Sequence, residues 1–226
     1  MTRPAVLAEC ARLAAGAGAG ALASIARRRG SLPMSATAKL LVTASGARIG
    51  TVGGGCLEAE VIERAMDVLE RRMPALSMHS LNNELAGDYG LTCGGTAEIF
   101  IEPVFPDPVL ARAYDEANAL IARGERGVMV TAMDWSNGPR KLAVLVEGEA
   151  AGVDRAKRPP IGESRGSIAA RDLRESDLSD EQLRAVVVNL DPFANEPLFT
   201  NDFLIEPIVG RPRVVVFGAG HVGARV

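Results

Sequence analysis

The clearest periodic pattern in the chain runs from Leu57 to Leu69, where apolar residues recur every three or four positions. Charged residues fill the intervening positions, so the pattern predicts a helix with one buried face. A second main helix is predicted over residues 107–123, because Asp107-Pro108 suits a helix start. A shorter helix is predicted over residues 5–15, and the glycine-rich run 16–20 ends it.

Apolar and β-branched runs predict strands around these helices. They occupy residues 21–26, 39–44, 48–52, 75–81, 96–104, 128–133, 141–146, 185–190, 198–208 and 213–217. The segments 39–44 and 48–52 flank a short turn and are expected to form a hairpin. Residues 124–148 repeat the order of strand, polar turn and strand seen in residues 20–50, which suggests an internal repeat. We therefore expect a mixed α/β fold with a largely antiparallel sheet and two main helices.

The composition is that of a soluble globular protein. The 226 residues are 47% hydrophobic and 23% charged, and the formal net charge is -3. Basic residues are mixed with acidic ones, so no nucleic-acid partner is expected. The N-terminus lacks the layout of a signal peptide, and no apolar stretch is long enough to cross a bilayer. We therefore predict a cytoplasmic protein without membrane partners.

The three cysteines are expected to be reduced thiols. Their number is odd and no CxxC pair occurs, which argues against a disulfide framework and against a zinc site. Cys10 falls on the apolar side of the predicted N-terminal helix and is expected in the core.

Cys56 stands at a boundary between a strand and a helix. The segment from Thr51 to Glu58 predicts a strand, the turn Gly53-Gly54-Gly55 and the start of the long helix. Free N–H groups and the dipole of a first helical turn favour a phosphate or a thiolate. Cys56 could therefore act as a nucleophile, a sulfur carrier or a ligand to a soft metal. It could equally be a small thiol behind a tight turn, and Glu58 would compete with a bound anion.

Cys93 has a similar setting, because it is followed by Gly94 and Gly95 just before a predicted strand. Two cysteines beside glycines, each at an element boundary, suggest that Cys56 and Cys93 converge on one pocket. The alternative is that both glycine clusters only allow the chain to form tight turns and do not bind a ligand.

Several motifs in order along residues 20–223 resemble the XdhC/CoxI family. They are Gly30-Ser31-Leu32-Pro33, the Lys39–Thr43 strand, Val52–Glu58, Gly90–Gly95, Glu206-Pro207 and Val216–Gly223. At Ser35–Ala38 this chain departs from the glycine-containing segment that family members carry. The departure is expected to reshape the loop that faces the pocket.

The resemblance implies an accessory protein rather than an enzyme. Such a protein binds molybdenum cofactor (molybdopterin) and assists its insertion into a xanthine- or CO-dehydrogenase-type apo-enzyme. Cys56 and Cys93 match the family's two motif cysteines. The resemblance implies that they act as molybdenum ligands through bound cofactor or as sulfur carriers. The cofactor-binding residues would be Gly53, Gly54, Gly55, Cys56, Glu58, Cys93, Gly94 and Gly95. A homodimer and a cysteine desulfurase partner are also expected.

The end of the chain carries an incomplete dinucleotide fingerprint. Gly218, Gly220 and Gly223 form a GxGxxG pattern after the apolar run 213–217, but no helix, second strand or acidic residue follows. We therefore expect an XdhC/CoxI-like domain over residues 1–209 and the start of a C-terminally truncated Rossmann domain over residues 210–226. These glycines are weaker candidate binding residues, and NAD(P) binding is not expected. The rival functions are an NAD(P)-linked oxidoreductase and a cysteine-based sulfurtransferase.

Overall fold

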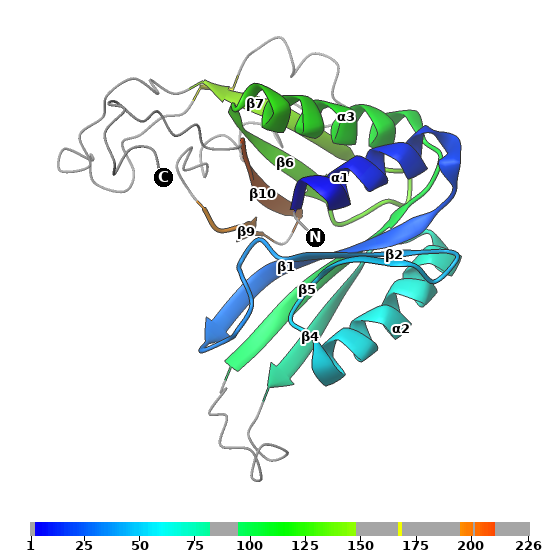
Figure 1. Cartoon of the computed structure of the whole chain (residues 1–226), viewed down its shortest axis with the longest axis vertical. Coiled ribbons are helices and arrows are strands. Elements are labelled where there is room, and N and C mark those ends of the chain that lie inside the picture. The colour runs from blue at the N-terminus through cyan, green and yellow to red at the C-terminus, as the bar shows by residue number, and fades with distance from the viewer. Residues whose placement is uncertain (1–2, 82–94, 148–166, 169–194, 201, 211–226) are drawn as a thin grey trace, which may run out of the picture.

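The computed structural model describes residues 3–81, 95–147, 167–168, 195–200 and 202–210 (Figure 1). In chain order the elements are α1 (Arg3–Arg12), a π-helical turn (Leu13–Ala17), β1 (Gly20–Gly30), β2 (Lys39–Thr43), β3 (Arg48–Thr51), α2 (Gly55–Arg71), β4 (Ala75–Leu81), β5 (Gly95–Val104), α3 (Pro108–Arg123), β6 (Arg126–Ala132), β7 (Lys141–Glu147), β8 (Ser167–Ile168), β9 (Leu198–Phe199) and β10 (Phe203–Val209). The mixed α/β class and the antiparallel pairing predicted from the sequence are confirmed. The predicted strands 185–190 and 213–217 lie outside the described residues, as do residues 211–226 of the expected Rossmann start.

The strands form two five-stranded sheets, whereas the sequence suggested one. The first sheet has the order β3-β2-β1-β5-β4 and the second has the order β8-β7-β6-β10-β9. All pairings are antiparallel. The strand expected over residues 198–208 is divided into β9 and β10. At this division the Thr200 hydroxyl accepts a hydrogen bond from the Phe203 N–H, which closes a turn.

The two sheets have the same strand order. The strands β3, β2, β1, β5 and β4 of the first sheet correspond to β8, β7, β6, β10 and β9 of the second. Short sequences recur at matching places. The start of β2, Lys39-Leu40-Leu41-Val42, corresponds to Lys141-Leu142-Ala143-Val144 in β7. Ile101-Glu102-Pro103 in β5 corresponds to Ile205-Glu206-Pro207 in β10. The internal repeat is therefore real, and it extends over five strands rather than one hairpin.

The helices that precede the two sheets also occupy matching places. A Cβ added to Gly20 in β1 would approach Leu13 to 3.2 Å, and one added to Gly127 in β6 would approach Leu120 to 2.6 Å. Each glycine thus lets the preceding helical segment lie close to its sheet. The repeat therefore includes the helical segment before each first strand.

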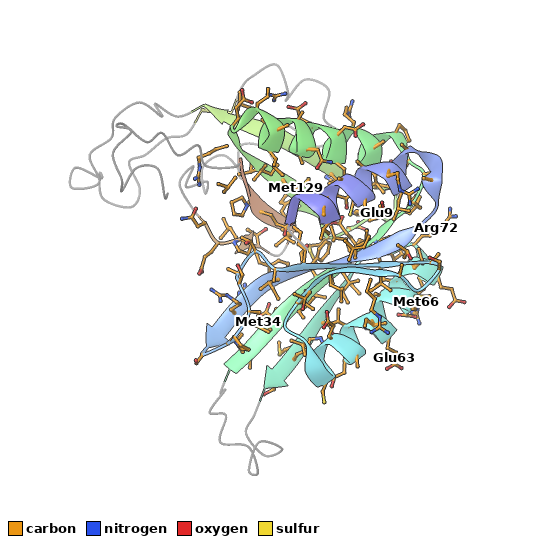
Figure 2. The ribbon with its side chains drawn as sticks, viewed as in Figure 1. Glu9, Met34, Glu63, Met66, Arg72 and Met129 are labelled. Atoms are coloured by element: carbon orange, nitrogen blue, oxygen red, sulfur yellow. The ribbon has the colours of Figure 1, made fainter. Side chains whose placement is uncertain are left out.

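The first sheet is covered on both faces. One face packs against α2 through a core that includes Ile99, Val61 and Met34. The other face joins α1, α3 and the second sheet in a core that includes Tyr114 and Met129. Figure 2 labels one member of each core, with Met34 on the α2 side of the first sheet and Met129 on the opposite side. Alternating strand residues therefore supply two separate apolar layers.

Two buried ion pairs connect the sheets reciprocally. The Lys39 ammonium donates to Glu206 Oε1 at 2.5 Å and to the Ser24 hydroxyl at 2.6 Å. The Lys141 ammonium donates to Glu102 Oε1 and to the Thr131 hydroxyl, both at 2.6 Å. In each case the hydroxyl comes from the sheet that carries the lysine, and the carboxylate comes from the other sheet. The pairs occupy equivalent positions of the two repeats, so each repeat neutralises a buried charge of the other.

Candidate functional site

The connection between β3 and α2 is a turn of three glycines with positive φ. Gly53, Gly54 and Gly55 have φ values of +138°, +77° and +63°. Side chains of L-residues rarely adopt this region, whereas glycine enters it without steric cost. Gly54 is the N-cap of α2, and it has no side chain with which to bond the first N–H groups. The turn therefore leaves the start of α2 without a side-chain cap, as its sequence predicted.

Three of the predicted site residues, Gly55, Cys56 and Glu58, lie in the first turn of α2. Cys56 is exposed, and Glu58 is the acidic residue of this turn. A Cβ built on Gly54 would lie 3.9 Å from Glu58 Oε2, so the carboxylate lies close to the glycine turn. A negative side chain here complements the helix dipole and opposes a second anion at the same end. The competition expected from the sequence between Glu58 and a bound anion therefore has a geometric basis.

A cavity of about 440 Å³ adjoins this turn, within the usual size range of small-molecule sites. It is lined by Val6 from α1, by Lys39, Gly50 and Thr51 from β2 and β3, by Gly53, and by Pro33, Met34, Ser35, Thr37 and Ala38 from the segment between β1 and β2. The lining includes three residues of the stretch Ser35–Ala38, which was expected to face the pocket. Gly54, Gly55 and Cys56 are not among the lining residues, so the cavity meets the turn at Gly53.

The cavity wall packs tightly against two glycines. A Cβ on Gly50, whose φ is +90°, would lie 2.2 Å from the carbonyl oxygen of Lys39. A Cβ on Gly53 would lie 2.8 Å from Cε of Met34. The first contact is with rigid backbone and the second with the end of a flexible side chain. Gly50 therefore fixes the shape of the cavity more strictly than Gly53 does.

Only part of the predicted site falls within the described residues. Cys93, Gly94, Gly218, Gly220 and Gly223 lie outside them, so the proposed meeting of Cys56 and Cys93 stays a prediction. Gly95 begins β5 and pairs with Leu81 at the end of β4. His79, two residues before Leu81, reaches the second turn of α2. The described residues that flank segment 82–94 therefore lie at the end of the sheet where α2 begins (Figure 1).

The contact of His79 with α2 was not foreseen from the sequence. Its Nδ1 lies 2.9 Å from Glu60 Oε2, and its Nε2 lies 2.7 Å from the Ser77 hydroxyl. The imidazole is 6% exposed. These hydrogen bonds tie α2 to the edge strand β4. A histidine in a polar, alternating segment gives no sequence signal for a partner 19 residues away.

The core position expected for Cys10 is confirmed, since its side chain is completely buried. Burial raises the pKa of this thiol, and the nearby carboxylate of Glu102 raises it further. Burial also raises the pKa of Tyr114 well above its ordinary value. Cys10 is therefore held as a neutral thiol, in contrast to the solvent-exposed setting of Cys56.

The described residues contain no cluster of three or more His, Cys, Asp or Glu side chains that could hold a metal ion. Within the same ranges, no helix is both long and apolar enough to pass through a bilayer.

Together these features define an α/β protein of two repeated antiparallel sheets with a glycine turn beside a cavity. The model of the XdhC and CoxI family matches residues 13–80 of this chain, which confirms the family resemblance over the segment that holds the turn. Over 81 residues, 36% of this chain and 15% of the relative, the chain is 40% identical to the uncharacterized protein YqeB of Escherichia coli (strain K12).

A solved structure shows the same fold over most of the chain. The crystal structure of a protein described as a xanthine dehydrogenase from Bacillus halodurans superposes with a TM-score of 0.54 at 19% identity. The similarity covers 93% of this chain and 54% of that chain. The chain therefore spans about half the length of this structural relative.

Proposed function

We propose that this chain binds molybdenum cofactor and assists its insertion into a molybdoenzyme of the xanthine- or CO-dehydrogenase type. The observation that carries the proposal is the cavity beside the Gly53–Gly55 turn, within the segment that matches the family model. All residues that line the cavity, except Val6, belong to residues 13–80. A site of suitable size therefore lies where the family resemblance is strongest.

The residues of the turn suit the phosphate of the cofactor. Main-chain N–H groups of an uncapped first helical turn bind anions, and the absence of Cβ atoms lets a ligand approach the backbone closely. Ser35, Thr37 and Thr51 belong to the cavity lining, and each carries a hydroxyl that can form hydrogen bonds. This set of neutral donors fits a phosphorylated, polar ligand.

Cys56 and Cys93 are proposed as thiolate ligands to the molybdenum of bound cofactor. When bound, the cofactor would supply a soft metal centre, and thiolates are ligands of choice for such centres. Cys56 is exposed at the start of α2, so its sulfur is accessible to a ligand. The described flanks of segment 82–94, which contains Cys93, lie at the same end of the first sheet. This placement is compatible with a shared site.

The apo-molybdoenzyme is the proposed partner, and a homodimer and a cysteine desulfurase are proposed further partners. A chain that carries cofactor must release it, so binding should be reversible and the partner should accelerate release.

The second candidate function is sulfur transfer, which the exposed thiol of Cys56 favours. In that case the Cys56 thiolate would take the outer sulfur from a persulfide of the desulfurase, which releases the desulfurase thiolate. A nucleophilic acceptor would then attack that outer sulfur and release the Cys56 thiolate.

Retention of molybdenum cofactor with its metal bound, measured by absorbance after filtration with the purified chain, tests the proposal. We expect retention by the wild type and loss in Cys56→Ala and Cys93→Ala. Cys10→Ala is the matched control, because it removes a thiol that is buried in the core. Absence of retention by the wild type, or equal retention by all three variants, would exclude the cofactor site. Transfer of labelled persulfide sulfur from Cys56 would favour the second candidate.

A further inference from the structure

Strand β4 is an edge of the first sheet that lacks the usual protection against association. It pairs with β5 through all seven of its residues without a register shift, and among the described residues no strand pairs with its other side (Figure 1). It contains no Asp, Glu, Lys, Arg or Pro. Edge strands normally avoid association by being short, by carrying charge or by bending at a bulge. The outer side of β4 therefore presents a regular row of main-chain hydrogen-bonding groups.

The other edge strands within the described residues are shorter. β8 and β9 have two residues each, and β3 has four. β3 also begins with the exposed Arg48 and contains Gly50, whose φ is +90°. β9 is the counterpart of β4 in the second repeat, yet it is much shorter. The repeated fold does not require a long, uncharged edge, so this property of β4 calls for an explanation of its own.

Two apolar side chains of this edge are exposed on the face of the sheet opposite α2. Met78 is 73% exposed and Leu76 is 38% exposed. Their neighbours on β5 are Glu98 and Phe100. Ser77 lies between them in the chain, so alternation puts it on the α2 face. Large apolar side chains beside an open strand edge are typical of an association site.

The flank of α2 that borders β4 carries charges of alternating sign. Glu60 identifies this flank, because its carboxylate contacts His79 of β4. Arg64, Asp67 and Arg71 follow Glu60 at helical spacing, and their side chains are 52%, 33% and 72% exposed. The order is negative, positive, negative, positive. Each charge therefore meets the opposite sign when this flank faces a reversed copy of itself.

A twofold axis at Ser77, perpendicular to the sheet, would use both features. Antiparallel pairing of two β4 strands about this axis sets Leu76 of each copy opposite Met78 of the other. α2 runs antiparallel to β4, because its C-terminal end leads directly into the strand and its second turn contacts the last residues of the strand. The same axis therefore reverses the helices, and it brings the Glu60 end of each α2 toward the Arg71 end of the other.

We propose that β4 is a dimerisation strand and that its partner is β4 of a second copy of this chain, paired antiparallel about Ser77. The first sheets of the two copies would join into one continuous sheet with both α2 helices on the same face. Main-chain hydrogen bonds and apolar contacts would supply affinity, and the charges of α2 would select the antiparallel direction. The inference gives the proposed homodimer a specific interface, and it rests on the proposed function only for the expectation of a homodimer.

Sedimentation equilibrium of the full chain over a range of concentrations tests this interface. We expect the wild type to dimerise and Met78→Lys to raise the dimer Kd about tenfold or more, because a charge on an edge strand opposes pairing. Met66→Lys is the matched control, since Met66 is also an exposed apolar residue, 42% accessible, but lies off the charged flank of α2. Its Kd should stay within about twofold of the wild type. Equal effects of the two substitutions would overturn the inference.

The direction of pairing can be tested with the charges of α2. Arg64→Asp places like charges at residues 64 and 67 of opposite copies and should weaken the dimer by about threefold. Adding Asp67→Arg restores opposite signs across the axis and within the helix, so the double variant should return to within about twofold of the wild-type Kd. An unchanged Kd in Arg64→Asp, or no recovery in the double variant, would contradict the antiparallel arrangement.

Oxidative cross-linking tests the register. In a background with Cys56→Ser and Cys93→Ser, Ser77→Cys should form a disulfide between copies, because residues directly opposite in an antiparallel pair have Cβ atoms about 4.5–5.5 Å apart. Ser80→Cys is the control on the same strand. The two residues 80 would lie on opposite sides of the axis and should not cross-link. Cross-linking at Ser80 in preference to Ser77 would overturn the proposed register.

Dimerisation and cofactor retention can fail separately. Met78 does not belong to the cavity lining, so Met78→Lys should retain cofactor as the wild type does. A chain that dimerises through β4 and retains no cofactor would support this inference and exclude the proposed function. A wild type that stays monomeric up to its solubility limit would overturn the inference. If that monomer binds an apo-molybdoenzyme and Met78→Lys does not, the edge belongs to the enzyme rather than to a second copy.

Discussion

The Lys141 ammonium lies 2.6 Å from the Glu102 carboxylate, although the two residues belong to different sheets. Neither side chain is more than 1% exposed. Attraction between two such charges is offset by the cost of removing both from water, so their net contribution to stability is small. Removal of one partner is different, because it leaves the other charge buried without compensation.

We expect Lys141→Met or Glu102→Leu alone to lower the free energy of unfolding by about 3–5 kcal/mol. The variant with both changes should recover at least half of that loss, because it places apolar groups in an apolar layer. Urea unfolding followed by the fluorescence of the buried Trp135 measures this difference. A double variant as unstable as the sum of the single variants would contradict the expectation.

Stability should fall in alkaline solution. Burial raises the pKa of Cys10 and that of Tyr114, so both groups stay protonated in the folded state when they ionise in the unfolded chain. Stability is therefore complete below the ordinary pKa values. It begins to fall as pH rises above about 8.5 for the thiol and above about 10 for the phenol, and it keeps falling up to the raised pKa of each group in the folded state. The free energy of unfolding measured between about pH 7 and 11 should show two increases in its downward slope, one at each ordinary pKa. Cys10→Ala should remove the first and Tyr114→Phe the second, and unchanged profiles would contradict this.

The thiols should differ sharply in reactivity. In a Cys93→Ser background, iodoacetamide should modify the exposed Cys56 of the native chain within minutes at about pH 8, where a fraction of ordinary thiols is ionised. Cys10 should react only after denaturation, since it is buried and its pKa is raised. Mass spectrometry of the digested protein gives the site of modification. Native-state modification of Cys10 would show that the core around α1 opens readily.

Gly50 and Gly46 form a matched pair for testing the cavity wall. Their φ values are +90° and +83°, so alanine introduces a similar backbone strain at either position, about 1–2 kcal/mol. An added Cβ meets the Lys39 carbonyl oxygen at Gly50, whereas it meets nothing within 4 Å at Gly46. Gly50→Ala should therefore cost about 1–3 kcal/mol more than Gly46→Ala in denaturant unfolding. Equal costs would show that the wall can relax.

Local sequence patterns were sufficient to predict the main elements but not their pairing. The strand predicted at 75–81 has the same bounds as β4, and α2 follows the apolar period that begins at Leu57. Alternation indicates which face of a strand is buried, but it does not indicate which distant strand lies beside it. The separation into two sheets depends on pairings such as that of β10 with β6, which join residues far apart in the chain. These pairings could not be predicted from periodicity.

In the candidate site, too, local features could be predicted from the sequence and long-range contacts could not. The turn Gly53-Gly54-Gly55 and the place of Cys56 at the start of α2 depend on neighbouring residues, and they could be predicted from the sequence. The sequence left open whether the Cys56 thiol is exposed or packed behind the turn, and the structure places it on the surface. The contact between Lys39 and Glu206 spans 167 residues, and a lysine at the start of an apolar strand resembles an ordinary solvent-exposed strand end. Its only sequence signal is the recurrence of Lys-Leu-x-Val at Lys141.

The matched lysine–glutamate pairs also carry information about ancestry. A gene encoding one such half, with its lysine and its glutamate, would yield a self-complementary product whose two copies neutralise each other's charges across a twofold axis. Duplication and fusion of that gene would give a single chain with the reciprocal arrangement that Lys39, Glu206, Lys141 and Glu102 display. After fusion the copies are free to diverge, so that one can acquire a binding cavity while the other keeps only the scaffold.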